Sequence, residues 1–271
     1  MTGGKLMQVI GLIGGTGSDF SIEHAEEILV ETSFGTTTLI KGSTPQKTPL
    51  YVLARHGDNH TYLSNMINHR ANIAALKEVG VSAIIATTSC GLIDTTIPLA
   101  SPVIFDDLFF PDNRLPGGIP CTFYQTPGES GRSHLIAPSH FSQTVRSALE
   151  KALDNMSTPS RNNGCYCYAL GPRFNSHAEI RAMQHVGGTM VSQTAAPEAI
   201  LSAELEIPYG LIGLATDYAN GVTSDITSID ELNQNIEKAG EIFNGVCLRA
   251  ADILAKEEVL PFDTGFNYRF F

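Results

Sequence analysis

The chain has 271 residues, and its 42% hydrophobic content can bury a large core, so we expect one α/β domain over residues 1–271, although the length also allows two smaller domains. It carries 28 acidic residues against 17 Lys and Arg, and the net charge of −11 repels phosphate polymers and argues against nucleic-acid and anionic-membrane partners. Five cysteines without the paired spacing of a zinc or redox site are typical of a reduced, cytoplasmic protein.

The apolar runs of the sequence argue against membrane insertion and secretion. The longest, at residues 81–93, is interrupted by Ser, Thr and Gly and is too short to span a bilayer. The run at residues 7–13 ends in Gly-Gly-Thr-Gly, which is not a small-residue cleavage site. We therefore expect this run to be the first buried strand.

The glycine-rich segment Gly14-Gly15-Thr16-Gly17 follows that strand. Its backbone N–H groups can close around an anion, and Thr16 adds a hydroxyl donor. The segment lacks the third glycine of a dinucleotide fingerprint and the lysine of a P-loop. Taken alone, a tight turn without a ligand explains it equally well.

A basic pair follows the third of the predicted strands. Strands are expected at residues 37–40 and 50–54, and the second of them leads directly into Arg55 and His56. A guanidinium can bind a phosphate through two parallel hydrogen bonds, and the imidazole can donate another. The alternative is an exposed loop with two solvated basic residues. The apolar spacing at residues 68–79 predicts a helix that stops at Gly80.

A strand at residues 81–86 is followed by small residues at 87–92, which we interpret as a turn. Small side chains there would let a planar ligand lie close to the backbone. Cys90 offers a thiol in this turn, but nothing in the sequence pairs it with a base, so a nucleophilic role is the weaker hypothesis.

The second half of the chain alternates between apolar runs and amphipathic segments. The patterns predict strands at residues 103–106, 166–170 and 211–215, a polar linker at residues 157–163, and helices at residues 139–153, 176–186, 197–205 and 229–256. The strand at residues 211–215 ends on Thr216-Asp217-Tyr218, which places Asp217 in the ligand-binding crevice of an open α/β sheet. A cap of the next turn is the alternative role for Asp217. The aromatic tail at residues 260–271 is expected to dock on the body or on a neighbouring subunit.

Six of these motifs, in this order, resemble the trimeric purine nucleoside phosphorylase family, and their spacing is most like its 5′-methylthioadenosine phosphorylase branch. They are Gly14-Gly-Thr-Gly17, Arg55-His-Gly57, Thr88-Ser-Cys-Gly91, Gly171-Pro-Arg-Phe174, Thr194-Ala-Ala-Pro-Glu198 and Thr216-Asp-Tyr218. The resemblance implies a single α/β domain with a mixed, twisted sheet flanked by helices. It also implies phosphorolysis, in which inorganic phosphate attacks C1′ of a purine nucleoside, without a metal or organic cofactor, in a homotrimer or a dimer of trimers.

The resemblance further implies roles for individual residues. Phosphate would be held by Thr16, Arg55, His56, Ser89 and Thr194. The nucleoside would be bound by Cys90, Gly91, Phe174, Asn175, Ser192, Gln193, Asp217, Ala219, Ile229 and Asn233, together with His134 from a neighbouring subunit. Asp217, His56 and Arg55 would be catalytic, with Asp217 on N7 and the 6-substituent of the purine.

Three positions depart from the pattern of the methylthioadenosine branch. Ala219 stands where a second acid is usual, Asn175 where Ser is usual, and Asn233 where an apolar residue is expected. The sequence therefore leaves open phosphorylases for 5′-methylthioinosine, inosine or adenosine. From other classes, a nucleoside hydrolase or a non-catalytic purine-binding module remain alternatives. Arg55 with His56 disfavours the hydrolase, because water needs no anion clamp.

Overall fold

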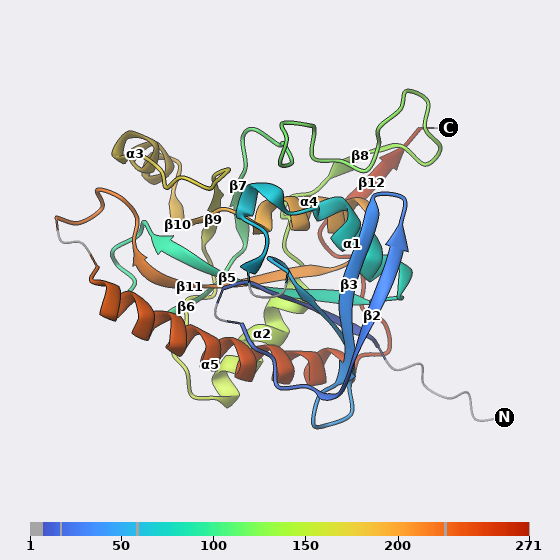
Figure 1. The fold of residues 1–271 in the computed structure, drawn as a ribbon, viewed down its shortest axis with the longest axis horizontal. Helices are drawn as coiled ribbons and strands as arrows, with labels where there is room; N and C mark the ends of the chain where they lie inside the picture. The colour runs from blue at the N-terminus through green and yellow to red at the C-terminus, as the bar shows by residue number, and fades with distance from the viewer. Residues whose placement is uncertain (1–7, 17, 58–59, 225–226, 271) are drawn as a thin grey trace.

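The computed structural model describes residues 8–16, 18–57, 60–224 and 227–270 (Figure 1). Within these residues, ten strands form one mixed sheet with the order β2-β3-β4-β1-β5-β10-β9-β7, and β11 and β6 branch from β5. The strands are β1 (Ile10–Gly14), β2 (Glu23–Thr32), β3 (Gly35–Ser43), β4 (Pro49–Ala54), β5 (Ala83–Leu92), β6 (Pro102–Ile104), β7 (Asp107–Phe109), β9 (Cys165–Tyr168), β10 (Gly188–Ser192) and β11 (Tyr209–Tyr218). A separate antiparallel pair joins β8 (Ser133–Ile136) to β12 (Phe266–Arg269).

Helices cover both faces of the sheet (Figure 1). They are α1 (His69–Glu78), α2 (Gln143–Asn155), α3 (His177–His185), α4 (Ala195–Glu204) and α5 (Ile229–Leu254). Helices α1 and α4 pack on one face, and α2 and α5 pack on the other. This arrangement confirms the predicted fold class. It also explains why the central strands are apolar without alternation, since a strand buried on both faces needs no polar side.

The four strands β4, β1, β5 and β11 are parallel neighbours. All five residues of β1 are buried, with Ile10 and Leu12 in the α2/α5 layer and Ile13 in the α1/α4 layer. Because parallel strands end at the same edge of a sheet, the loops after β1 and β4 and the ends of β5 and β11 meet there.

The interpretation of residues 87–92 as a turn is wrong. Strand β5 continues to Leu92, since it pairs with β11 from Ile84↔Tyr209 to Leu92↔Tyr218 and with β10 at Gly91 and Leu92. Pairing on both sides overrides the weak strand propensity of these small residues. Strand β11 is likewise longer than predicted and includes Asp217. Its register shifts between Ala215 and Asp217, which is the signature of a bulge that re-aims the side chains near it.

The helix boundaries differ from prediction mainly at the start of α2, where Ser142 caps Val145 and the helix begins four residues later than expected. Helix α4 begins at Ala195, so Pro197 still lies in the first turn. In the part of the chain that the structure describes, no helix is long and apolar enough to cross a membrane. Gly17 of the predicted glycine turn, Phe271 of the predicted aromatic tail and the first residue of the first predicted strand lie outside the described residues.

Candidate active site

A cavity of about 310 Å³ opens at the edge of the sheet where the parallel strands end. The predicted phosphate residues Thr16, Arg55, His56, Ser89 and Thr194 all line it. It is also lined by Cys90, Gly91, Phe174, Asn175, Ser192, Gln193, Asp217 and Ala219 from the predicted nucleoside set. The structure therefore brings together, in one cavity, motifs that are up to about two hundred residues apart in sequence.

Arg55, directly after β4, lies at the buried end of this cavity and is 2% exposed. Its Nε donates to Oε1 of Glu198 at 2.5 Å and its Nη2 donates to Oε2 at 2.8 Å. Nη1 donates to the carbonyl of Thr87 at 2.8 Å. The Nε–Nη2 edge of the guanidinium is thus already paired with Glu198. Only its remaining Nη hydrogens are left to meet an anion.

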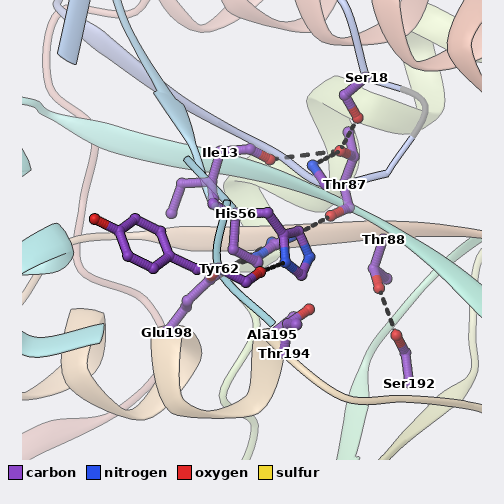
Figure 2. A network of polar contacts seen from close by, with 12 residues as sticks. Ile13, Ser18, His56, Tyr62, Thr87, Thr88, Ser192, Thr194, Ala195 and Glu198 are labelled. Carbon is purple, nitrogen blue, oxygen red and sulfur yellow. Dashed lines mark hydrogen bonds and ion pairs between the residues drawn. The ribbon is translucent and has the colours of Figure 1, made fainter. Parts of the chain in front are cut away.

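His56 is fixed by a hydrogen bond at its Nδ1, which lies 2.9 Å from the carbonyl oxygen of Tyr62 (Figure 2). A carbonyl only accepts, so Nδ1 carries the proton and Nε2 of the neutral ring has only a lone pair to offer. Burial lowers the pKa of His56, which favours the neutral ring. The prediction that His56 donates to phosphate therefore holds only when the ring is protonated.

His60 is a neighbour of the site that the sequence analysis missed. Its ring stacks on that of His56 with centroids 5.0 Å apart, and its Nε2 lies 3.1 Å from the hydroxyl of Thr16. The available signal was its position in the same loop, four residues after His56. Proximity of two imidazoles to Thr16 concentrates titratable groups where an anion was predicted.

Small hydroxyl side chains link β5, β10 and the turn after β1 along the cavity wall. Thr88 donates to the Ser192 hydroxyl at 3.1 Å (Figure 2). Ser192 donates to the Ser89 carbonyl at 2.9 Å. Ser89 in turn donates to the Thr16 carbonyl at 3.0 Å. These bonds fix the backbone at Ser89 and Thr16, so the cavity is shaped before any ligand enters.

Two backbone N–H groups at the start of α4 donate to the hydroxyl of the buried Tyr166. The Tyr166 hydroxyl lies 3.4 Å from the backbone nitrogen of Thr194 and 3.1 Å from that of Ala195. The Thr194 side chain accepts no capping hydrogen bond from the backbone of α4, so its hydroxyl is available to the cavity. Helix N-termini favour anions, so this turn adds a positive potential at the Arg55 end.

Asp217 lines the cavity near the end of β11, and two strands, β1 and β5, separate β11 from β4, which leads into Arg55. The Thr216 hydroxyl donates to its Oδ1 at 3.1 Å, and burial raises the pKa of the carboxyl. Ala219 is 7% exposed and packs on Gly91, where an added Cβ would lie 3.4 Å from the Ala219 Cα. The side-chain amide of Asn220 donates to the carbonyl of Asn175 at 2.8 Å, which closes this end with neutral groups.

Burial of Cys90 weakens the case for a thiol nucleophile further. The side chain is 3% exposed, and burial raises the pKa of the thiol to about 12. Within the described residues, no group of three or more His, Cys, Asp or Glu side chains is arranged to hold a metal ion.

Ile229, Asn233 and His134 belong to the predicted nucleoside set but do not line the cavity. Ile229 is 76% exposed and Asn233 is exposed, whereas Leu232 and Ile236 of the same helix α5 form that wall. The sequence already indicated these two residues, because Leu232 and Ile236 are both apolar and one helical turn apart, so they lie on the same face of α5.

His134 lies on β8, outside the cavity of its own chain. It stands opposite Tyr268 of β12, and its ring is 5.1 Å from that of Phe270 in an edge-on contact. It lines a separate cavity of about 420 Å³. A role for His134 at a substrate site would therefore need a second copy of the chain.

Comparison with known proteins covers nearly the whole chain. A family model described as Phosphorylase superfamily matches residues 9–252, a range that includes every residue of the cavity wall. The chain is 34% identical over 257 residues to a 6-oxopurine nucleoside phosphorylase from Pyrococcus furiosus, covering 93% of this chain and 95% of the relative. It is 33% identical over 215 residues to an S-methyl-5′-thioadenosine phosphorylase from Drosophila melanogaster, covering 77% and 73%. A solved structure of methylthioadenosine phosphorylase from Schistosoma mansoni in complex with adenine superposes with a TM-score of 0.82 at 25% identity, covering 92% of each chain.

Proposed function

The chain belongs to the phosphorylase superfamily, and from that premise we propose that it is a pentosyltransferase that cleaves purine nucleosides with inorganic phosphate, 5′-methylthioadenosine first among them. The products would be adenine and 5-methylthioribose 1-phosphate. The observation that carries the proposal is one cavity that joins Thr16, Arg55 and Thr194, a set suited to an anion, with a half-buried carboxyl, Asp217, at the other end. A nucleoside placed between them would present its sugar to phosphate and its base to Asp217.

The chemistry needs only what these two ends supply. A phosphate oxygen attacks C1′ while the C1′–N9 bond breaks, and the electron pair of that bond leaves with the purine. The sugar passes through a cationic state that the phosphate charge stabilises, and the departing base takes a proton at N7. The raised pKa of the Asp217 carboxyl makes it a suitable proton donor. No metal or organic cofactor has a step in this scheme, since inorganic phosphate is the co-substrate.

The base preference rests on Asp217. After its proton has passed to N7, the Asp217 carboxylate only accepts, so it pairs with the 6-amino group of adenine and opposes the O6 of hypoxanthine. The second candidate is a 6-oxopurine phosphorylase. It is supported by the neutral Asn220–Asn175 contact and by Ala219, which give this end of the cavity a single acid. The relative from P. furiosus bears the 6-oxopurine name.

An assay of a nucleoside panel with and without phosphate tests the proposal. We expect base release from 5′-methylthioadenosine that falls to background in phosphate-free buffer. Release that persists without phosphate would identify a nucleoside hydrolase, and the absence of release from any purine nucleoside would leave a binding module. Faster cleavage of 5′-methylthioinosine or inosine would select the second candidate.

We also propose a cytoplasmic homotrimer in which His134 completes a neighbouring site. Support comes from the exposed side chains of the β8–β12 pair, where His134 stands beside Tyr268 and Phe270. Mixing an inactive Arg55→Ala chain with an inactive His134→Ala chain should restore part of the activity, because some sites would then receive both intact contributions. Verified mixed oligomers without recovery would refute the shared site.

A further inference from the structure

An ion pair between α4 and the loop after β4 lies behind the anion-binding end of the cavity. Both oxygens of Glu198 accept from Arg55, through Nε at 2.5 Å and Nη2 at 2.8 Å. Each side chain is 1% exposed. We call this pair the Arg55–Glu198 fork. Two parallel bonds between planar groups fix the orientation of the guanidinium as well as its position.

The fork is braced from three sides. The Tyr209 hydroxyl donates to Oε2 of Glu198 at 2.9 Å, and Nη1 of Arg55 donates to the Thr87 carbonyl at 2.8 Å. An added Cβ at Gly15 would lie 2.6 Å from Nη1, so the glycine turn rests directly on the guanidinium. Figure 2 shows Glu198 on the same helix as Ala195, with Thr194 just before it. The guanidinium therefore has one available orientation.

The charges of the fork cancel in the fold. Burial alone would raise the pKa of the Glu198 carboxyl, but the Arg55 guanidinium outweighs burial and holds that pKa below its usual value. Arg55 stays protonated for the same reason. A neutral pair attracts a distant anion only weakly. The fork can therefore contribute to anion binding mainly through the direction of the unpaired N–H groups of Arg55.

Five guanidinium N–H groups are available in an arginine, and the fork and Thr87 together engage three of them. The remaining two belong to Nη1 and Nη2. Since Arg55 lines the cavity beside Thr16 and Thr194, these two are the groups that a bound anion can reach. Glu198 thereby decides which edge of Arg55 faces the ligand.

We propose that Glu198 is a positioning residue for the phosphate co-substrate: it grips the Nε–Nη2 edge of Arg55 so that the remaining Nη hydrogens point at the phosphate. This inference rests on the proposed function, because it needs a phosphate in the cavity. Glu198 belongs neither to the predicted phosphate-binding residues nor to the predicted nucleoside-binding residues, so the inference adds a residue of α4 to the site.

The test is the split between two Michaelis constants in Glu198→Gln. The amide would set an N–H donor against a guanidinium donor, so the guanidinium turns. The KM for phosphate should rise by about tenfold or more, while the KM for 5′-methylthioadenosine changes by less than about threefold. Titration of inorganic phosphate into the free enzyme should show the same weakening, and titration of adenine should show none.

Tyr209→Phe is the matched control, since it removes one hydrogen bond from the same carboxylate and leaves the fork intact. Its phosphate KM should stay within about threefold of wild type. If Glu198→Gln does not fold, Glu198→Asp keeps the charge pair but withdraws the carboxylate, and it should show the same split at a smaller size. In an Arg55→Ala background, the Glu198 substitution should have no further effect on phosphate binding.

A Glu198 variant whose two KM values change together, or whose melting temperature falls while phosphate binding is unchanged, would overturn the inference and leave the fork with a structural role alone. Failure of the proposed function is a different result. In that case the wild-type enzyme itself would show no phosphate dependence and no phosphate binding.

Discussion

Replacing Asp217 by asparagine should move base preference toward 6-oxopurines, and the reason lies in its neighbour. Thr216 donates its hydroxyl proton to Oδ1 of Asp217. An asparagine at this position would turn its carbonyl oxygen toward that hydroxyl, because the alternative sets donor against donor. Its NH₂ group would then face the purine. The group that meets the 6-substituent would change from an acceptor to a donor.

The size of the change follows from the hydrogen bonds exchanged. For a 6-amino purine, the variant loses a hydrogen bond to a charged group, worth about 1.5–3 kcal/mol, and for a 6-oxo purine it gains a neutral one, worth about 0.5–1.5 kcal/mol. Loss of the proton donor for N7 slows both substrates and cancels in their ratio. The ratio of kcat/KM values should therefore shift by about 2–4.5 kcal/mol, and we set about tenfold as the smallest acceptable shift.

The measurement is kcat/KM for 5′-methylthioadenosine and 5′-methylthioinosine in wild type and Asp217→Asn. Asp217→Asn combined with Thr216→Val is the control, since it removes the hydroxyl that selects the amide orientation and should shrink the shift. An unchanged ratio in the single variant would refute the role of Asp217 in reading the 6-substituent. A wild type that already prefers the 6-oxo substrate would refute the assignment to 5′-methylthioadenosine.

Sulfate carries no proton, so it should compete with phosphate poorly at about pH 8, where the neutral His56 ring offers only an acceptor. Sulfate should compete better as the pH falls through the lowered pKa of His56. The sulfate inhibition constant measured against pH checks this, and His56→Asn should flatten the profile. Burial lowers the pKa of His69 from 6.5 to about 4, so the unfolded chain takes up this proton first and the fold loses stability as the pH falls across that interval. His69→Leu should lose about 2 kcal/mol less than wild type between about pH 7.5 and about pH 5 in urea unfolding, and an equal loss in both proteins would contradict this. Gly213→Ala should cost about 1–3 kcal/mol, because the added Cβ would lie 2.6 Å from the Phe105 ring, and Phe105→Leu should recover part of that loss.

The meeting of the motifs at one edge was predictable from sequence because of a topological rule. Apolar runs that end in Thr16, Arg55 and Asp217 indicate buried parallel strands, and the carboxyl ends of such strands share an edge. The continuation of β5 to Leu92 was not predictable locally, since its Thr, Ser, Cys and Gly residues favour turns and only pairing with β10 and β11 extends it. Strand β2 was missed because its side chains are largely exposed and charged, so it has no apolar alternation to detect.

Orientation within the site was beyond the reach of the sequence. A glutamate in the first turn of a helix, such as Glu198, is ordinarily explained by the helix dipole, and nothing local indicates that it is 1% exposed and paired with Arg55. The tautomer of His56 is likewise set by a carbonyl six residues away. Such details depend on which polar groups are buried together, and burial is a property of the whole packed fold.

The charge balance of the site argues for a particular way of holding phosphate. Glu198 neutralises Arg55, burial lowers the pKa of His56 and favours its neutral ring, and the chain as a whole carries −11. Long-range attraction therefore contributes little, and the phosphate must be held by short, directed bonds from the Arg55 Nη groups and the Thr194 hydroxyl. A phosphate that is not over-stabilised by positive charge keeps its negative charge for the cationic sugar, and this is where catalysis requires it.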